Sequence, residues 1–166
     1  HRWFPDYEYS IWIDGNITVR DDINELIAEW LDDANLAIPD HAQNILDPRD
    51  CVYKEAQVIL ELGKRNGNFK DDPQTMIDQM NRYIQDDFEG PTGLAVSMQV
   101  LRRHNESDCI SAMERWWKEL SYGSKRDQLG FNYAMWKEEF KYNYLPGDSR
   151  DNKYFLNMGA HTGKKK

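Results

Sequence analysis

The stretch EYSIWIDGN, residues 8–16, decides how the fold is interpreted. The side chains alternate between two sides, Tyr9, Ile11 and Ile13 against Ser10 and Trp12. Alternation with period two, in β-branched and aromatic residues, is typical of a strand. Asp14 and Gly15 favour a turn, so we predict that the strand ends there.

Segments with helical spacing alternate with short apolar runs along the rest of the chain. The predicted helices cover about residues 21–33, 48 to 63 or 67, 73–84, 106–122 and 125–140. Further strands are predicted in the apolar runs 36–38, 93–101 and 141–145, the last at an edge of the sheet. The buried face of helix 106–122 is predicted to carry Ile110, Met113, Trp116 or Trp117, and Leu120.

Alternation of strands with helices predicts an α/β sandwich in one domain over residues 1–166. A chain of this length has the ordinary size of one domain. Three or four strands make a thin sheet for so many helices. We therefore expect that part of a sheet on the N-terminal side is missing from the chain.

Composition excludes several classes of protein. The chain has 29 Asp and Glu against 21 Lys and Arg, a formal net charge of -8, which argues against a nucleic-acid partner. No window approaches the roughly 18 consecutive apolar residues of a membrane span, so no transmembrane segment is predicted. Cys51 and Cys109 have no CxxC spacing, which favours free thiols and a reducing compartment, the cytoplasm.

The triplet Asp14-Gly15-Asn16 is the first candidate site. In extended backbone, residues two apart point to the same side, so the Asp14 and Asn16 oxygens are expected to face one ligand. Oxygen ligands suit Mg²⁺ or Mn²⁺, which can carry a diphosphate to an acidic protein. The alternative is a simple turn, because Asp-Gly-Asn is also favourable turn chemistry.

Two further clusters carry charged groups. Asp127, in the sequence KRDQ at 125–128, stands near a helix N-terminus, where it either caps the helix or acts as a general base or acceptor contact. Arg102, Arg103 and His104 follow a predicted strand, and ligands bind at such strand ends in open α/β sheets. The alternative for the two arginines is a surface ion pair.

These strings together resemble a glycosyltransferase-like domain family with plant mucilage-related, bacterial and viral members. The strings are WIDGNI at 12–17, CVYKEA at 51–56, GL at 93–94, RRHN at 102–105, WW at 116–117 with Glu119, and RDQ at 126–128 with FNY at 131–133. The resemblance extends from Phe4 to about Pro146. Its most specific parts are RRHN and RDQLGF.

The resemblance implies a GT-A-like fold that transfers a sugar from a nucleotide-diphosphate donor to a saccharide acceptor. It implies Mn²⁺ or Mg²⁺ at a DxD-like motif. The metal residues that the resemblance implies are Asp14, Asn16 and His161. From the residues themselves we expect Asp127 to be the catalytic base or an acceptor contact. The expected donor or acceptor contacts are Trp12, Glu55, Arg102, Arg103, His104 and Gln128. Asn16 replaces a second Asp, which removes one charge from the motif.

The resemblance also implies a preceding region. In GT-A folds a βαβ region that binds the nucleobase comes before the DxD-like strand, and here only thirteen residues precede Asp14. We therefore expect the chain to be the C-terminal part of such a fold. A plant-type parent would imply the Golgi lumen. The alternative function is a noncatalytic binding or scaffold domain derived from a glycosyltransferase.

Overall fold

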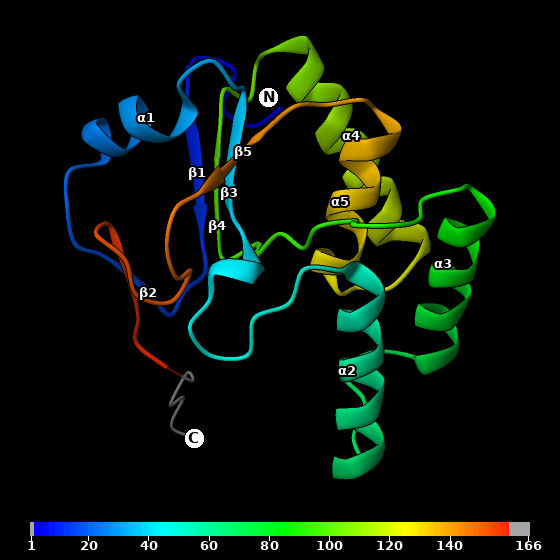
Figure 1. Cartoon of the computed structure of the whole chain (residues 1–166). Coiled ribbons are helices and arrows are strands. Elements are labelled where there is room, and N and C mark those ends of the chain that lie inside the picture. The colour runs from blue at the N-terminus through cyan, green and yellow to red at the C-terminus, as the bar shows by residue number, and fades with distance from the viewer. Residues whose placement is uncertain (1, 160–166) are drawn as a thin grey trace.

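The structure, a computed structural model, describes residues 2–159 and shows a mixed α/β fold (Figure 1). A four-stranded sheet has the order β1-β4-β3-β5. Its strands are β1 (Ser10–Ile13), β3 (Leu36–Pro39), β4 (Gln99–Arg102) and β5 (Asn143–Leu145). Both β1 and β3 run antiparallel to β4, whereas β3 and β5 are parallel. A smaller antiparallel sheet joins β2 (Ile17–Val19) to β6 (Phe155–Asn157).

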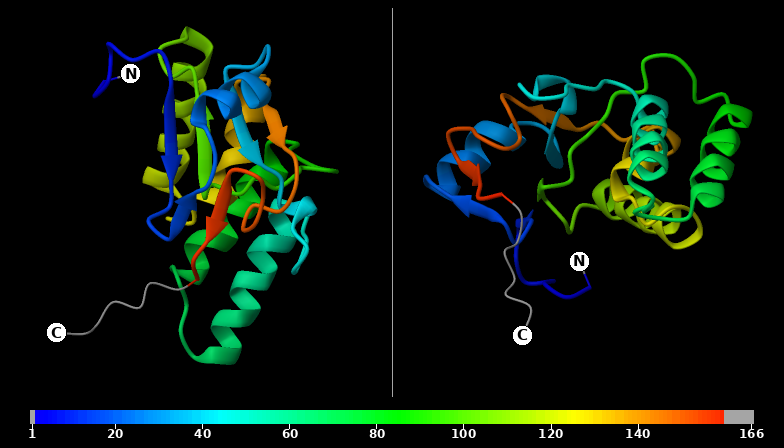
Figure 2. Two further views of the ribbon diagram at one scale, coloured as in Figure 1. Left: turned by 90° about the vertical axis from the view of Figure 1, so that its left-hand side faces the viewer. Right: turned by 90° about the horizontal axis from the view of Figure 1, so that it is seen from below.

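The helices cover both faces of the larger sheet. They are α1 (Ile23–Leu31), α2 (Val52–Asn66), α3 (Pro73–Gln85), α4 (Ser107–Tyr122) and α5 (Asp127–Lys137), with a short 3-10 helix η1 (His41–Gln43). In Figure 1, α1 lies on one face of the sheet and α4 and α5 on the other. Figure 2 shows α2 and α3 side by side, and both contribute to one apolar cluster with α5.

Successive side chains of the larger sheet point to its opposite faces, and each face has its own apolar core. Leu36, Ile38 and Val100 pack toward α4 and α5. Ala37 and Leu101, on the opposite face, pack toward α1 and the smaller sheet. The larger sheet is therefore covered on both faces, as its short apolar strands require.

Helix α5 lies at the centre of the helical layer. Every residue from Gln128 to Met135 is buried. Gly130 allows α4 to approach closely, because a Cβ there would lie 3.0 Å from the Glu119 Cβ. On another side, the ring of Tyr133 stacks on Tyr83 of α3 at 3.8 Å between centroids. This position holds the first turn of α5 firmly in place.

Several predicted elements are confirmed. The strand in residues 8–14 is present as β1, and 141–145 contains the edge strand β5. Asp22 caps α1 by accepting from the Asn24 N–H, and Pro73 begins α3. Gly67, with φ of 65°, ends α2 in the left-handed conformation that glycine adopts without steric cost.

The predicted strand 93–101 is wrong over most of its length, because β4 begins only at Gln99. Gly93 has a φ of 67°, and a Cβ there would lie 2.7 Å from the Tyr144 hydroxyl. Residues 93–98 make only isolated bridges at Gly93 and Ala95. The Ala95 N–H donates to the Asn132 side chain (2.9 Å) instead of to a strand partner.

The predicted buried face of 106–122 is also partly wrong. Trp117 is 66% exposed, whereas Cys109, Ala112 and Glu119 are the buried residues of α4. The close packing of α4 on α5 favours small side chains such as Ala112 at the contact, and this turns Trp117 outward. Ile110, Met113, Trp116 and Leu120 are half-buried.

Other boundaries differ by a few residues. Helix α2 begins at Val52 instead of Pro48, because residues 48–50 form a loop in which the Arg49 N–H donates to His41 Nδ1 (3.1 Å). Helix α5 ends at Lys137, since Glu139 has a φ of 48°. The smaller sheet was not predicted from the sequence.

Cys109 is buried, Cys51 is half-buried, and both are free thiols. Burial raises the pKa of Cys109 to about 11. None of the helices within residues 2–159 has the length and apolar character to cross a membrane.

Candidate functional site

A polar pocket of about 630 Å³ opens beside the end of β1 and the start of α5. Residues that line it include Asp14, Arg49, Glu55, Arg126, Asp127 and Arg150. We refer to it as the polar pocket. It brings together four of the residues selected from the sequence, namely Asp14, Glu55, Asp127 and Gln128.

Two loops are tied together at one wall of the polar pocket. The Asn44 side-chain oxygen accepts hydrogen bonds from the N–H and the hydroxyl of Ser149, both at 2.9 Å. The Asp148 carboxylate accepts from the N–H groups of Ile45 and Arg150, both at 2.8 Å. Backbone contacts of this kind place Arg150 beside the loop that carries Arg49.

The polar pocket is rich in hydrogen-bond donors although the whole chain is acidic. Arg49, Lys70, Arg126 and Arg150 line it. Asn44 Nδ2, Arg126 Nε and Gln128 Nε2 are buried and have no hydrogen-bond partner among residues 2–159. Buried donors without a partner are costly in a folded protein. The arrangement therefore favours a ligand with many acceptor oxygens, such as a phosphate or a sugar.

His41 supports this wall in its neutral form. Its Nδ1 accepts from the Arg49 N–H, and its Nε2 lies 3.1 Å from the Arg49 guanidinium. Burial, and then the Arg49 charge, lower the pKa of His41 below its ordinary value. Protonation would remove the Nδ1 acceptor and place a second cation beside Arg49.

We expect the free energy of unfolding to decrease as pH falls below about 6.5, the ordinary pKa of the His41 imidazole. The unfolded chain binds the proton there, whereas the folded chain resists it, so stability is complete above that pH and is lost below it. Urea unfolding of the wild type and of His41→Asn on both sides of this pH measures the effect. Equal pH dependence in the two proteins would show that His41 has no such role.

Asp14 and Asn16 have different surroundings. Asp14 lines the polar pocket, and its carbonyl accepts from the Ile17 N–H (2.9 Å), which closes the expected turn. Because Gly15 and Asn16 form that turn, their backbone is not extended. The Asn16 amide instead donates to Asn157 (3.4 Å) and to the Gly159 carbonyl (3.1 Å), and Asn16 does not line the polar pocket.

The residues of the polar pocket can supply one carboxylate ligand to a divalent ion, but not a complete set of protein ligands. Within the described part of the chain, no group of three or more His, Cys, Asp and Glu side chains could hold an ion. His161 lies outside the described residues. Mg²⁺ often takes only one or two protein carboxylates and completes its shell with substrate phosphates and water. Asp14 fits that smaller role, whereas a complete protein cage does not form.

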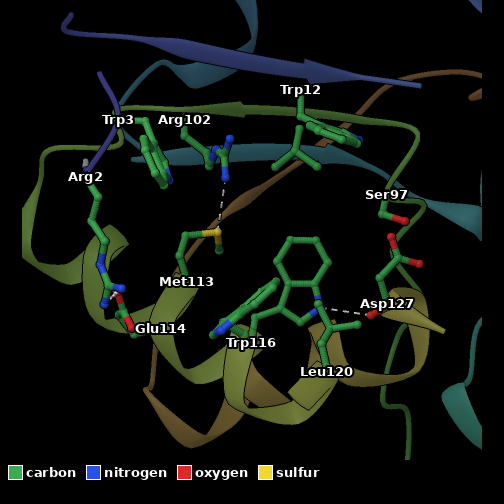
Figure 3. Close-up of a pocket in the computed structure, with 12 residues that line it drawn as sticks. Arg2, Trp3, Trp12, Ser97, Arg102, Met113, Glu114, Trp116, Leu120 and Asp127 are labelled. Atoms are coloured by element: carbon green, nitrogen blue, oxygen red, sulfur yellow. Dashed lines mark hydrogen bonds and ion pairs between the residues drawn. The ribbon is translucent and has the colours of Figure 1, made fainter. Parts of the chain in front are cut away.

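Asp127 is the first residue of α5, and Arg126 is the N-cap residue. The Asp127 carboxylate accepts from the Gln128 N–H (2.9 Å), and the Asp127 carbonyl accepts from Trp116 Nε1 (2.9 Å). The second contact is drawn in Figure 3. Asp127 is thus a first-turn acid and not the cap that one interpretation of the sequence predicts. Its backbone is held by α4.

Glu55 and Gln128 also line the polar pocket, but only Glu55 is already paired with another side chain. Glu55 is buried and accepts from Arg49 Nε at 2.5 Å. Arg49 in turn forms an ion pair with Asp47. The Glu55 carboxylate is therefore neutralised by a cation, whereas the Gln128 amide nitrogen has no described partner.

Trp12 and Arg102 lie in a second cavity, of about 640 Å³ (Figure 3). Its walls include Trp3, Trp12, Met113, Trp116, Trp117 and Leu120, and we refer to it as the aromatic groove. Asp127 and Ser97 line both the aromatic groove and the polar pocket. The two cavities therefore meet at Asp127.

Arg103 and His104 lie elsewhere and make structural contacts. The Arg103 guanidinium donates to the carbonyls of Asp32 (3.1 Å) and Ala34 (2.5 Å) after α1. His104 Nε2 lies 2.9 Å from the Phe4 carbonyl, which holds the N-terminal segment. Neither residue lines the polar pocket.

Sequence reasoning missed Arg49, Arg126 and Arg150 as site residues. Arg49 and Arg150 lie in irregular segments, and no periodicity or motif marks them. Arg126 belongs to the RDQLGF string that carries the resemblance, but no role in the site was predicted for it. Its place in that string and its adjacency to Asp127 are the signals that could have identified it.

Comparison with known proteins gives two matches. The family model of the TOD1/MUCI70, glycosyltransferase-like domain matches residues 1–156. The chain is 25% identical over 156 residues to "Probable hexosyltransferase MUCI70" of Arabidopsis thaliana, and the match covers 87% of this chain. It spans only 24% of the length of that relative. No solved structure matches the chain.

Proposed function

Because the chain belongs to the TOD1/MUCI70 glycosyltransferase-like domain family, we propose that it transfers a hexosyl group from a nucleotide-diphosphate sugar to a saccharide hydroxyl. The observation that carries this proposal is the composition of the polar pocket. It combines a strand-end carboxylate, Asp14, with a helix-start carboxylate, Asp127, and with four basic side chains. A GT-A-like arrangement of the donor site is part of the same proposal.

In this proposal the basic side chains bind the diphosphate of the donor. Arg126 is the best placed of them, because no described carboxylate pairs with its guanidinium and its Nε is a buried donor without a partner. Arginine binds phosphate oxygens through charge-assisted hydrogen bonds, which are stronger than neutral ones. Arg150 and Lys70 add positive charge nearby.

Asp14 is the proposed protein ligand of Mn²⁺ or Mg²⁺. Such an ion, when bound, neutralises negative charge on the departing diphosphate. In this proposal the diphosphate binds between Asp14 and Arg126, and these two residues orient it.

Asp127 is the proposed general base. Its carboxylate has no cationic partner among the described residues, whereas Glu55 is paired with Arg49. Asp127 also lies where the polar pocket and the aromatic groove meet, so a hydroxyl entering from the groove would reach it next to the donor. A positioned base removes the proton as the hydroxyl attacks the sugar carbon.

Binding and transfer assays on the full chain test this proposal. A panel of nucleoside diphosphates and nucleotide sugars is titrated with Mn²⁺ and with a chelator, and transfer to saccharides is measured by the released nucleoside diphosphate. We expect binding that Mn²⁺ strengthens, and we expect Asp14→Ala to lose that strengthening while its melting temperature stays near the wild-type value. Asn16→Ala is the matched variant outside the polar pocket.

The alternative is a noncatalytic binding or scaffold domain. It predicts no binding of any nucleoside diphosphate and no released product. That combination of results would overturn the proposed transferase.

A further inference from the structure

The aromatic groove is a large open cavity whose two walls come from different elements. One wall is the α4-facing side of the sheet, with Trp12 from the edge strand β1 and Val100 and Arg102 from the neighbouring strand β4. The other wall is α4, with Met113, Trp116 and Leu120 (Figure 3). The register of the sheet pairs Trp12 with Val100, so both side chains point to the α4 face.

Two of the indole rings in this groove are exposed to solvent. Trp12 is 57% exposed and Trp117 is 66% exposed. Trp116 is half-buried, since its ring packs edge-on against Phe131 at 5.1 Å and its Nε1 donates to Asp127. Large exposed apolar side chains that gather in one cavity mark a binding surface more often than isolated ones do.

Polar groups lie at defined places around these rings. Ser97 and Asp127 stand at one end of the groove, and the Arg2–Glu114 ion pair (2.6 Å) stands at the other (Figure 3). Between them Arg102 reaches toward Met113, with its Nη1 3.7 Å from the sulfur. Arg102 Nε is buried and has no described partner, so the groove also contains a donor in need of an acceptor.

We propose that the aromatic groove binds the saccharide acceptor, with the accepting hydroxyl at the Asp127 end. This inference rests on the proposed transferase function. Indole faces carry negative quadrupole charge, and they attract the weakly positive C–H faces of a sugar ring. Hydroxyl groups at the ring edges bind to charged neighbours such as Arg102. A peptide helix or a second protein copy would not need the shared opening to the polar pocket at Ser97 and Asp127.

The length of the groove defines the acceptor further. It continues past Asp127, along Trp116 and Trp12, to the Arg2–Glu114 pair. A single sugar ring at Asp127 would leave the remaining indole faces exposed to water. The acceptor is therefore an oligosaccharide or the end of a polysaccharide, and the matching monosaccharide binds more weakly.

The test measures saccharide binding directly, without donor. Neutral and uronic-acid tetrasaccharides, with their monosaccharides, are titrated into the wild type, Trp12→Ala and Trp117→Ala by calorimetry. Each variant is expected to weaken tetrasaccharide binding by about threefold to tenfold, the size of an aromatic stacking contribution. Trp12→Phe keeps a stacking surface and is expected to recover part of the affinity.

Tyr122→Ala is the matched control, because Tyr122 is 87% exposed on α4 but does not line the groove. Nucleoside diphosphate binding, measured in parallel, should be unchanged in all these variants. If the wild type binds no nucleoside diphosphate, the proposed function is refuted. The saccharide titrations still test the groove assignment separately.

Three results would overturn the groove assignment. One is a wild type that binds none of the saccharides. Another is equal tetrasaccharide affinity in the wild type and the Trp12 and Trp117 variants. The third is a concentration-dependent dimer that Trp12→Ala dissociates, which would identify a second copy as the occupant.

Discussion

Asp127→Asn is expected to lower the rate of sugar transfer by about 10²–10⁴-fold, the usual contribution of a general base. The amide cannot take the proton of the acceptor hydroxyl. It can still accept the Gln128 N–H bond that the carboxylate accepts now. The lost charge at the helix N-terminus costs up to about 1 kcal/mol, so the variant should remain folded and should still bind donor.

Single-turnover transfer, donor affinity and melting temperature together measure this result. Gln128→Ala is the control, because it changes the neighbouring side chain in the polar pocket without removing a carboxylate, and it should be milder. Transfer near the wild-type rate in Asp127→Asn would leave Asp127 as a first-turn acid only. Glu55 would then be the next candidate, or the reaction would retain configuration.

Arg126→Gln is expected to weaken nucleoside diphosphate binding by about 10–150-fold, which corresponds to about 1.5–3 kcal/mol for a hydrogen bond to a charged group. The Arg126 guanidinium has no acidic partner in the described chain, so the variant leaves no carboxylate unpaired. Its effect therefore reports on the ligand more directly than Arg49→Gln would. Calorimetry at fixed salt concentration measures it.

Lys125→Gln is the matched control for Arg126. Lys125 is the neighbouring residue, it is exposed, and it does not line the polar pocket. Removing its charge should change the affinity for the diphosphate only slightly. If the two variants bind equally well, long-range charge and not the Arg126 contact accounts for binding.

Asp14 and Asp127 of the candidate site could be selected from the sequence because each lies at the end of a regular element. Asp14 follows an alternating strand, and Asp127 precedes a run with helical spacing. Local patterns of this kind depend on near neighbours only. The same patterns located α1, α3 and the edge strand β5 correctly.

The rest depends on contacts between distant residues. Periodicity in α4 could not decide between Trp116 and Trp117, because the choice is made by close packing against Gly130 of α5. The predicted strand 93–101 is absent over most of its length for two reasons. Gly93 is in the left-handed conformation, and the Ala95 N–H donates to the Asn132 side chain. Arg150 reaches the polar pocket through Asp148 and Ser149, which contact a loop about a hundred residues earlier.

The smaller sheet determines when the Asp14 turn can be fixed as the chain folds. Ile17 pairs with Asn157, and the Asn16 carbonyl accepts from the Met158 N–H, so the turn is held by the last part of the described chain. Contacts between residues so far apart in sequence carry a high loop-closure entropy and form slowly. During synthesis they must also wait for residue 158 to leave the ribosome. The Asp14 N–H also donates to the Met98 carbonyl (2.9 Å), so β4 can hold Asp14 before the smaller sheet fixes the turn that follows it.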